Sequence, residues 1–235
     1  MSPRRRKLDL TTSLPAPTAP SLVLPQTPLP HLATGLPELD ASLGTHGLPR
    51  GRVTEISGAT WLARSLPALS LIRTLHAGSS DAVAVWIDLQ GDLDHGLLLS
   101  FGIDESRLMI VRPRDGDDAL NQAARILQKR WFQALVISGM PISRPQDQLY
   151  VGLLERLAIF APWTRACILY LIEADAHSPV LARLAAVRLA VPSLVSRRSG
   201  RHSHYTGTVR VLKNRFGRSG QHVAVQCTII CPPEP

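Results

Sequence analysis

One eight-residue segment has the spacing of a loop that binds phosphate groups. Such a loop follows the pattern G-x-x-x-x-G-K-[ST], in which glycines let backbone amides wrap the phosphates, the lysine reaches the terminal phosphates and the hydroxyl binds magnesium. Here the segment begins at Gly58 and ends at Ser65, but Ala63 and Arg64 replace the glycine and the lysine. A methyl group obstructs a positive φ, and a planar guanidinium is longer than the ammonium it replaces. We therefore expect a vestigial turn between a strand and a helix, with no ATP, magnesium or other cofactor bound.

Basic side chains are concentrated towards the C-terminal end of the chain. The formal net charge is +8, and positions 176–233 contain no aspartate or glutamate. Such a region favours a polyanion such as DNA, or an acidic protein surface, through counterion release and steering. A solvated basic face is the alternative. We expect a flexible basic loop with one aromatic ring able to stack on a base, or else an ordinary loop. Its candidate nucleic-acid-binding residues are Arg197, Arg198, Arg201, His202 and Tyr205.

The first thirty positions differ in composition from the rest of the chain. Positions 1–30 hold seven of the 19 prolines and a basic run at positions 4–7. Because such a segment cannot form a core, we expect a disordered basic tail at 1–30 and one core domain at 31–235. No run of about 18 apolar residues occurs, and no apolar stretch of a signal peptide follows the basic run, so we expect a cytoplasmic protein without a membrane segment. The three cysteines fit no zinc spacing, which predicts buried reduced thiols and no metal site.

Apolar runs alternate with amphipathic stretches from residue 52 onward. We expect strands at 52–57, 82–88, 108–111, 134–138, 166–172 and 187–191, and helices at 66–76, 93–101, 118–130, within 146–160 and at 179–185. Repeated strand–helix units predict an α/β fold with a mostly parallel central sheet flanked by helices. The last two strands, at 207–213 and 222–230, have no helix between them, which predicts a C-terminal antiparallel hairpin.

Several segments, taken in order, resemble the RecA family of recombination ATPases. They are 33–44, 47–58, 86–94, 101–104, 108–113 and 209–215, and the resemblance extends over about residues 31–231. It implies a RecA-like P-loop NTPase core.

The resemblance also implies a hydrolytic site whose main side chains have been replaced in this chain. Where RecA has a glutamate that activates the attacking water, this chain has Gln90, which cannot accept a proton. The next core strand ends at Ser138 instead of at a magnesium-linked aspartate. With the altered phosphate loop, these losses predict a pseudo-ATPase without catalytic residues. Asp88 and Asp175 are candidate metal contacts or, alternatively, polar strand ends.

Two cations remain where the resemblance implies a contact between subunits. Lys213 and Arg215 occupy positions at which RecA carries paired lysines that reach the ATP of a neighbouring subunit. Their retention suggests that this protein docks on an active RecA subunit and caps or blocks a filament end. The alternative is that both are exposed cations on a hairpin.

Among RecA relatives, a short core with an eroded nucleotide site looks most like the ImuA type of protein. That resemblance implies a non-catalytic accessory role in DNA repair and SOS-induced mutagenesis, with RecA, an error-prone polymerase subunit, or both as partners. Two alternatives remain open. One is a divergent ATPase that uses Arg64, Ser65 and Asp88, and the other is a DNA-binding recombination mediator that acts through the basic C-terminal third.

Overall fold

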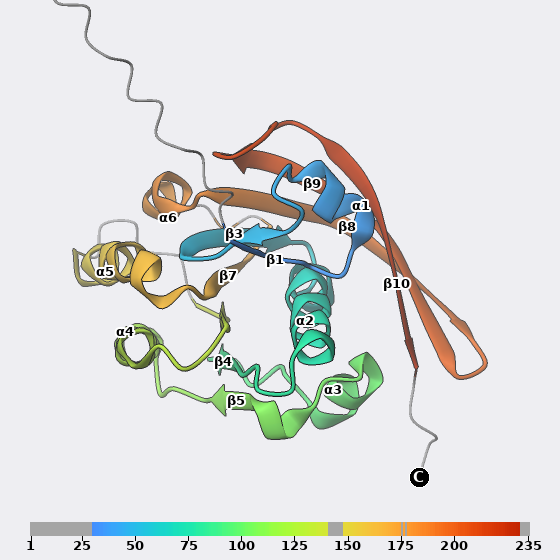
Figure 1. The fold of residues 1–235 in the computed structure, drawn as a ribbon, viewed down its shortest axis with the longest axis horizontal. Coiled ribbons are helices and arrows are strands. Elements are labelled where there is room, and N and C mark those ends of the chain that lie inside the picture. The colour runs from blue at the N-terminus through green and yellow to red at the C-terminus, as the bar shows by residue number, and fades with distance from the viewer. Residues whose placement is uncertain (1–29, 141–147, 175, 177, 231–235) are drawn as a thin grey trace, which may run out of the picture.

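An eight-stranded sheet forms the centre of the molecule (Figure 1). The computed structural model describes residues 30–140, 148–174, 176 and 178–230. The strand order is β10-β9-β8-β3-β7-β6-β4-β5. The strands are β3 (Arg52–Gly58), β4 (Ala84–Asp88), β5 (Leu108–Val111), β6 (Ala134–Ser138), β7 (Cys167–Glu173), β8 (Val187–Ser199), β9 (His202–Asn214) and β10 (His222–Ile230).

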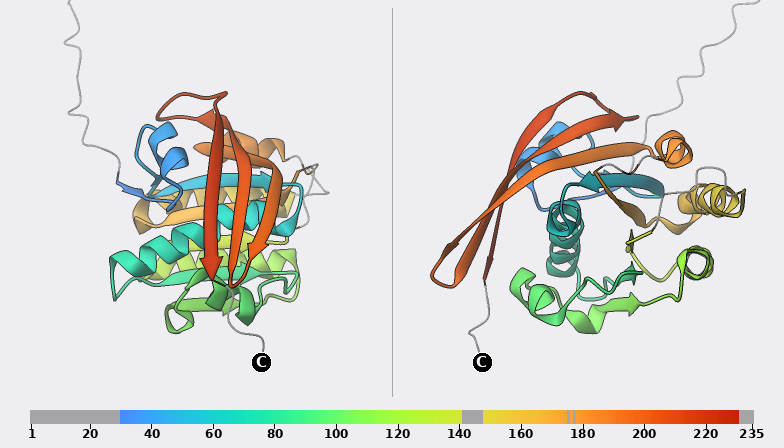
Figure 2. Two further views of the ribbon diagram at one scale, coloured as in Figure 1. Left: turned by 90° about the vertical axis from the view of Figure 1, so that its right-hand side faces the viewer. Right: turned by 180° about the vertical axis from the view of Figure 1, so that it is seen from behind.

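Helices cover both faces of the parallel part of this sheet, which confirms the predicted fold class (Figure 2). They are α2 (Trp61–Gly78), α3 (His95–Phe101), α4 (Gly116–Lys129), α5 (Gln148–Thr164) and α6 (Pro179–Leu184), with a short 3-10 helix η1 (Glu105–Arg107) before β5. Neighbouring strands from β8 through β3, β7, β6 and β4 to β5 are parallel. Strands β4 and β6 are buried at every position because both faces are covered.

The sheet separates two apolar cores. One core lies under α2 and α3 and includes Trp86 and Phe101, and the other lies under α4 and α5 and includes Phe132 and Tyr170. Cys167 and Cys227 are buried free thiols, as predicted, and Cys231, the third cysteine of that prediction, lies outside the described residues. Within the described residues, no helix is long and apolar enough to cross a membrane.

An N-terminal unit that the sequence did not predict precedes β3. It consists of β1 (His31–Leu32), α1 (Pro37–Ser42) and β2 (Leu48–Pro49), and the two short strands pair antiparallel. Leu36, Leu39 and Leu43 are completely buried, and α1 packs against β10. This unit therefore closes one end of the first core.

The antiparallel part of the sheet is larger than expected. The predicted hairpin of β9 and β10 is present, but β8 does not end at residue 191. It continues to Ser199 and pairs antiparallel with β9 from Val187 to Ser199, whereas its parallel pairing with β3 ends at Val191. The result is a three-stranded ribbon, β8–β9–β10, that extends beyond the parallel sheet (Figure 2).

Candidate functional site

The segment with phosphate-loop spacing does not form an open loop. Helix α2 begins at Trp61, so Ala63 and Arg64 lie inside its first turns. The Thr60 side chain caps this helix and accepts a hydrogen bond from the amide of Ala63 at 3.2 Å. The amide of Arg64 donates to the carbonyl of Thr60, also at 3.2 Å. Both amides, which a phosphate loop would offer to its ligand, are therefore used within the helix. The expected turn between strand and helix is present but confined to Ala59 and Thr60, and the expected start of the helix at residue 66 is wrong.

Close packing fills the space between the strand end and this helix. A Cβ atom at Gly58 would lie 2.5 Å from the backbone nitrogen of Arg64. The side chain of Arg64 is only 6% exposed, and Ser65 is completely buried. The Ser65 hydroxyl has no hydrogen-bond partner among the described residues. The Ser65 side chain is thus enclosed by the protein, and Arg64 is largely buried.

The carboxylate of Asp88 closes its own loop at the end of β4. It accepts hydrogen bonds from three successive backbone amides, those of Gly91, Asp92 and Leu93, at 3.0 to 3.2 Å. This arrangement agrees with the interpretation of Asp88 as a polar strand end. Asp175, the other candidate carboxylate, lies outside the described residues.

Gln90 and Ser138 lie near each other at the carboxyl ends of the neighbouring strands β4 and β6. Asp88 is in register with Ser138, and the amide of Leu89 donates to the Ser138 carbonyl at 3.2 Å. Gln90 is exposed, and its side chain packs close to Gly139, where a Cβ atom would lie 2.9 Å from Gln90 Cγ. Neither side chain brings a carboxylate to this edge.

Lys213 and Arg215 lie at the opposite ends of the parallel strands, near the amino end of β3. Lys213 is in register with Arg188 near the start of β8. Its Nζ donates to the carbonyls of Ala182 and Arg183, at 2.8 and 3.2 Å. Arg215 donates to the same Arg183 carbonyl at 2.7 Å. Both cations thus bind the C-terminal end of α6, where positive charge is favoured.

A pocket of about 290 Å³ adjoins this cluster of cations. Its polar lining consists of Arg52, Arg183 and Arg215, and its other lining residues are apolar. Burial, with the nearby charges of Arg215 and Arg188, lowers the pKa of Lys213 below its usual range. The pocket is therefore an electropositive environment suited to an anionic group.

Carboxylates neutralise only part of this charge. Arg188 forms two hydrogen bonds with the buried Glu55, at 2.7 and 2.9 Å, and Arg183 forms an ion pair with Glu155 at 2.8 Å. No ion pair with a described carboxylate is found for the remaining three cations of the cluster, Arg52, Lys213 and Arg215.

The basic segment at 197–205 is a hairpin of two strands, so the expectation of a flexible loop is wrong. Ser199 pairs with His202, and only Gly200 and Arg201 form the turn. Arg197, Arg198, Arg201 and His202 are exposed there. Tyr205 instead packs against the first core, on the face of β9 that looks towards the helices.

A family model identifies the group of proteins to which this fold belongs. The model of the RecA N-terminal domain matches residues 25–155, more than half of the chain. The chain belongs to the RecA N-terminal domain family. The matched residues include the segment with phosphate-loop spacing, Asp88 and Ser138, and the match ends within α5. The cation pocket's residues Arg183 and Arg215, and the ribbon β8–β10, lie beyond it.

Three relatives illustrate how far the similarity extends. Protein RecA of Mycoplasma genitalium is 27% identical over 155 residues, which cover 60% of this chain and 45% of that protein. Protein RecA of Mycobacterium avium is 32% identical over 137 residues, which cover 55% and 39%. Protein RecA of Rhodococcus opacus is 30% identical over 137 residues, with the same coverage. The chain therefore matches less than half the length of these relatives.

The structure groups the predicted RecA-family residues into separate places. One group lies at the start of α2 and consists of Gly58, Ala63, Arg64 and Ser65. The cluster around Lys213 lies at the opposite ends of the parallel strands, near the amino end of β3. Sequence reasoning missed Arg52 and Arg183, which line the pocket with Arg215. It also missed Thr60, although a threonine directly before a helix is a recognisable capping signal.

Proposed function

We propose that this chain is a non-catalytic accessory protein of the RecA family, which acts in DNA repair in the cytoplasm by docking on an active RecA subunit. The observation that carries the proposal is the closed phosphate loop at the start of α2. ATP binding in this fold class depends on free backbone amides and an accessible cation. Here the amides of Ala63 and Arg64 are bonded to Thr60, and Arg64 is buried.

The cation pocket supports docking on a partner that carries phosphate. Arg52, Arg183 and Arg215 line it, and Lys213 adds charge beside it. Arginine is well suited to phosphate because its planar guanidinium donates two parallel hydrogen bonds. Our proposal places the nucleotide phosphates of the RecA subunit in this pocket, which would cap or block the end of a RecA filament.

The same features favour an ImuA-type role within the family. A nucleotide site that is closed by the start of α2 suits a regulatory subunit of a larger assembly. We place it in the SOS response, where it would help to assemble a translesion synthesis complex with an error-prone polymerase subunit.

Charge reversal in the pocket tests the docking step. Arg183→Glu keeps the backbone carbonyl that holds Lys213 and Arg215, so its effect on folding should be small. We expect this variant, and the double variant Lys213→Glu/Arg215→Glu, to lose at least tenfold in affinity for RecA–ATP filaments in a pull-down titration. Arg125→Glu, an exposed arginine on α4, is the matched control. RecA binding unchanged by the pocket variants would contradict the proposal.

The main alternative is a divergent ATPase that uses Arg64, Ser65 and Asp88. The burial of Ser65 and the three amide bonds of Asp88 argue against it. Titration of the protein with ATP and magnesium separates the two functions directly.

A further inference from the structure

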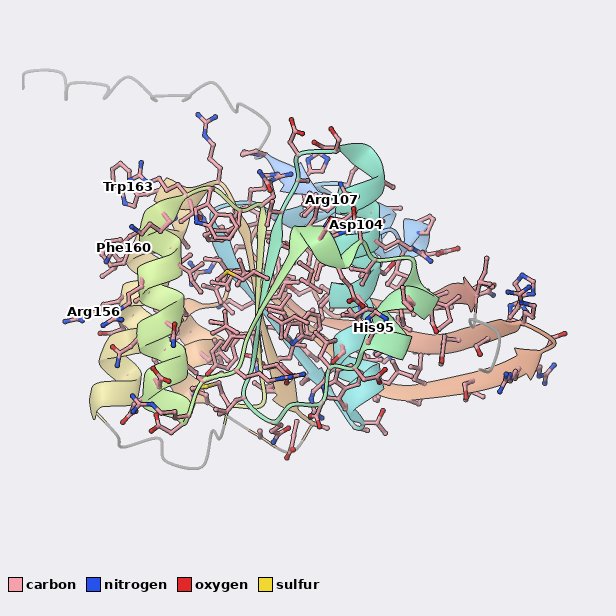
Figure 3. All side chains as sticks on the ribbon, turned by 90° about the horizontal axis from the view of Figure 1, so that it is seen from below. His95, Asp104, Arg107, Arg156, Phe160 and Trp163 are labelled. Carbon is pink, nitrogen blue, oxygen red and sulfur yellow. The ribbon has the colours of Figure 1, made fainter. Side chains whose placement is uncertain are left out.

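Helix α5 carries an apolar surface on the side that is turned away from the central sheet. Ile159 is 63% exposed and Trp163 is 65% exposed, which are among the highest values for large apolar side chains in the described residues. Arg156 precedes Ile159 by three residues and Trp163 follows it by four, so the three side chains share one face of the helix. Figure 3 shows Arg156 and Trp163 along this side of α5. These three residues are called the α5 stripe below.

The α5 stripe has the composition of a binding surface. Arg156 is exposed at one end of it, and Arg165 is exposed just beyond the other end. Apolar patches with a polar rim mark interaction sites on soluble proteins. Tryptophan and arginine are also the side chains that contribute most to binding at such sites. An occupant with apolar side chains and no positive charge would therefore suit the stripe.

The chain enters the fold beside the C-terminal end of α5. The carbonyl of Pro30, the first described residue, accepts a hydrogen bond from the amide of Arg50 at 2.8 Å. The guanidinium of Arg50 donates to the carbonyl of Arg165 at 3.3 Å. Gly51 packs so closely on the helix that a Cβ atom there would lie 3.2 Å from Cα of Pro162, which directly precedes the tryptophan of the stripe. The residues before Pro30 therefore join the fold next to the α5 stripe.

Residues 22–29, which directly precede Pro30, have the composition that such a surface binds. They contain two prolines, four aliphatic residues and no charged residue. Proline-rich segments favour the polyproline II conformation, which repeats every three residues. In this conformation Leu22, Pro25 and Pro28 would form one apolar ridge. Aromatic surfaces bind ridges of this kind because a polyproline II segment loses little conformational entropy when it docks.

We propose that residues 22–29 dock on the α5 stripe of the same chain in the polyproline II conformation, with Pro28 against Trp163 and Pro25 nearer Arg156. Three residues of polyproline II advance about 9 Å, and α5 advances about 10 Å from Arg156 to Trp163. The spacing of the two prolines thus matches the length of the stripe. The indole of Trp163 supplies a flat apolar surface and an N–H group that can donate to a carbonyl of the docked segment.

The covalent connection makes weak contacts sufficient for docking. A short flexible connection gives the attached segment an effective concentration in the millimolar range. Charge favours residues 22–29 over the basic run at positions 4–7, because that run carries four cations and Arg156 and Arg165 would repel them. The neutral segment nearest to Pro30 is therefore the part of the tail that covers the stripe.

The α5 stripe is separate from the cation pocket that the proposed function uses. Ala158 and Pro162 of α5 line that pocket, but Ile159 and Trp163 do not. Arg183 and Arg215, which carry the charge of the pocket, come from other elements. Docking of residues 22–29 and docking on RecA can therefore be lost independently.

Acrylamide quenching of tryptophan fluorescence in the full chain tests the proposal. The reference protein is a Trp131→Phe variant, because Trp131 is the other exposed tryptophan. The contribution of Trp163 is the difference between this protein and the same protein with Trp163→Phe. A docked segment shields the indole, so the quenching constant of Trp163 should be well below that of an exposed tryptophan in a short peptide.

A matched pair of variants in the same reference protein locates the shielding segment. Pro25→Ser/Pro28→Ser should raise the quenching constant of Trp163 about twofold, because serine neither favours polyproline II nor adds to the apolar ridge. Pro15→Ser/Pro17→Ser makes the same chemical change outside residues 22–29 and should leave the constant unchanged. Equal constants in the reference protein and both variants would show that the stripe is open to an external partner, and this would overturn the proposal.

Dilution distinguishes docking within one chain from docking on a second copy. Shielding by the segment of the same chain does not depend on protein concentration, so the quenching constant of Trp163 should stay the same across a wide range of dilution. A quenching constant that rises on dilution would show that a second copy supplies the covering segment. That result would refute docking within one chain.

Discussion

Thr60 caps helix α2 in the segment with phosphate-loop spacing, and its replacement should give a measurable loss of stability. Its side-chain oxygen accepts the amide of Ala63 at 3.2 Å and forms the N-cap of α2. Replacing a capping threonine by alanine costs about 1 kcal/mol, because one helix amide then loses its partner. Thr60 is exposed, so little packing energy is lost with it. For a domain of this size, 1 kcal/mol corresponds to a fall of about 2–4 °C in melting temperature.

Thermal and urea unfolding of Thr60→Ala and Thr60→Ser provides the assay. The serine variant keeps the accepting oxygen and should remain within a few tenths of a kcal/mol of the natural protein. The alanine variant should lose about 1 kcal/mol at an unchanged urea m-value. If alanine and serine variants are equally stable, Thr60 does not cap α2, and the interpretation of a loop closed by the helix start is refuted.

Three further predictions concern buried groups. Glu55→Ala should destabilise the protein by about 3 kcal/mol in urea unfolding, because it breaks the buried pair with Arg188; a loss under 1 kcal/mol would contradict this. His76 is buried, and neither ring nitrogen has a partner among the described residues. Its burial, with the charge of Arg107, lowers its pKa, so protonation favours the unfolded chain and stability falls as the pH drops below about 6.5. His76→Leu should be about 1 kcal/mol more stable at neutral pH, and its stability should fall less as the pH drops below about 6.5. If the dependence of stability on pH is unchanged in this variant, protonation of His76 does not cause the loss. Burial raises the pKa of the Cys167 thiol to about 12, and Cys227 is also buried. In a Cys231→Ser variant, Ellman's reagent should therefore label neither Cys167 nor Cys227 until the protein unfolds. Rapid labelling of the folded protein would contradict the burial of these thiols.

The parallel part of the fold could be predicted because its signals are local. Strands β4 and β6 are short, uninterrupted apolar runs, as expected for strands covered on both faces. Helix α4 has an apolar stripe and begins after Asp115, whose side chain caps it. In these elements the apolar pattern and the capping residue indicate the same structure, so their order and type could be predicted from the sequence alone.

The ribbon could not be predicted because its outer half lacks the alternation on which strand prediction depends. From Ser193 to Ser199 no residue of β8 is fully buried, so the segment has the composition of a loop. Its strand conformation depends on pairing with β9, which is a contact between distant residues.

The candidate site was predicted only in part for a similar reason. Family resemblance indicated Lys213 and Arg215, but Arg52 and Arg183 lie far from each other in the sequence and meet only where β3 and α6 come together. The helix expected at 66–76 begins earlier, at Trp61, because the residues with phosphate-loop spacing after Thr60 are compatible with a helix. Figure 3 shows Arg156 and Trp163 on α5, where both residues are exposed, whereas Phe160 on the same helix packs partly against the second core.

Titration with ATP and magnesium tests the central claim most directly. Isothermal titration calorimetry of the full chain, with a RecA protein as the positive control, should give no saturable heat at millimolar ATP, because the amides of Ala63 and Arg64 are bonded to Thr60. Saturable binding of ATP that is lost in an Arg64→Ala variant would contradict the account.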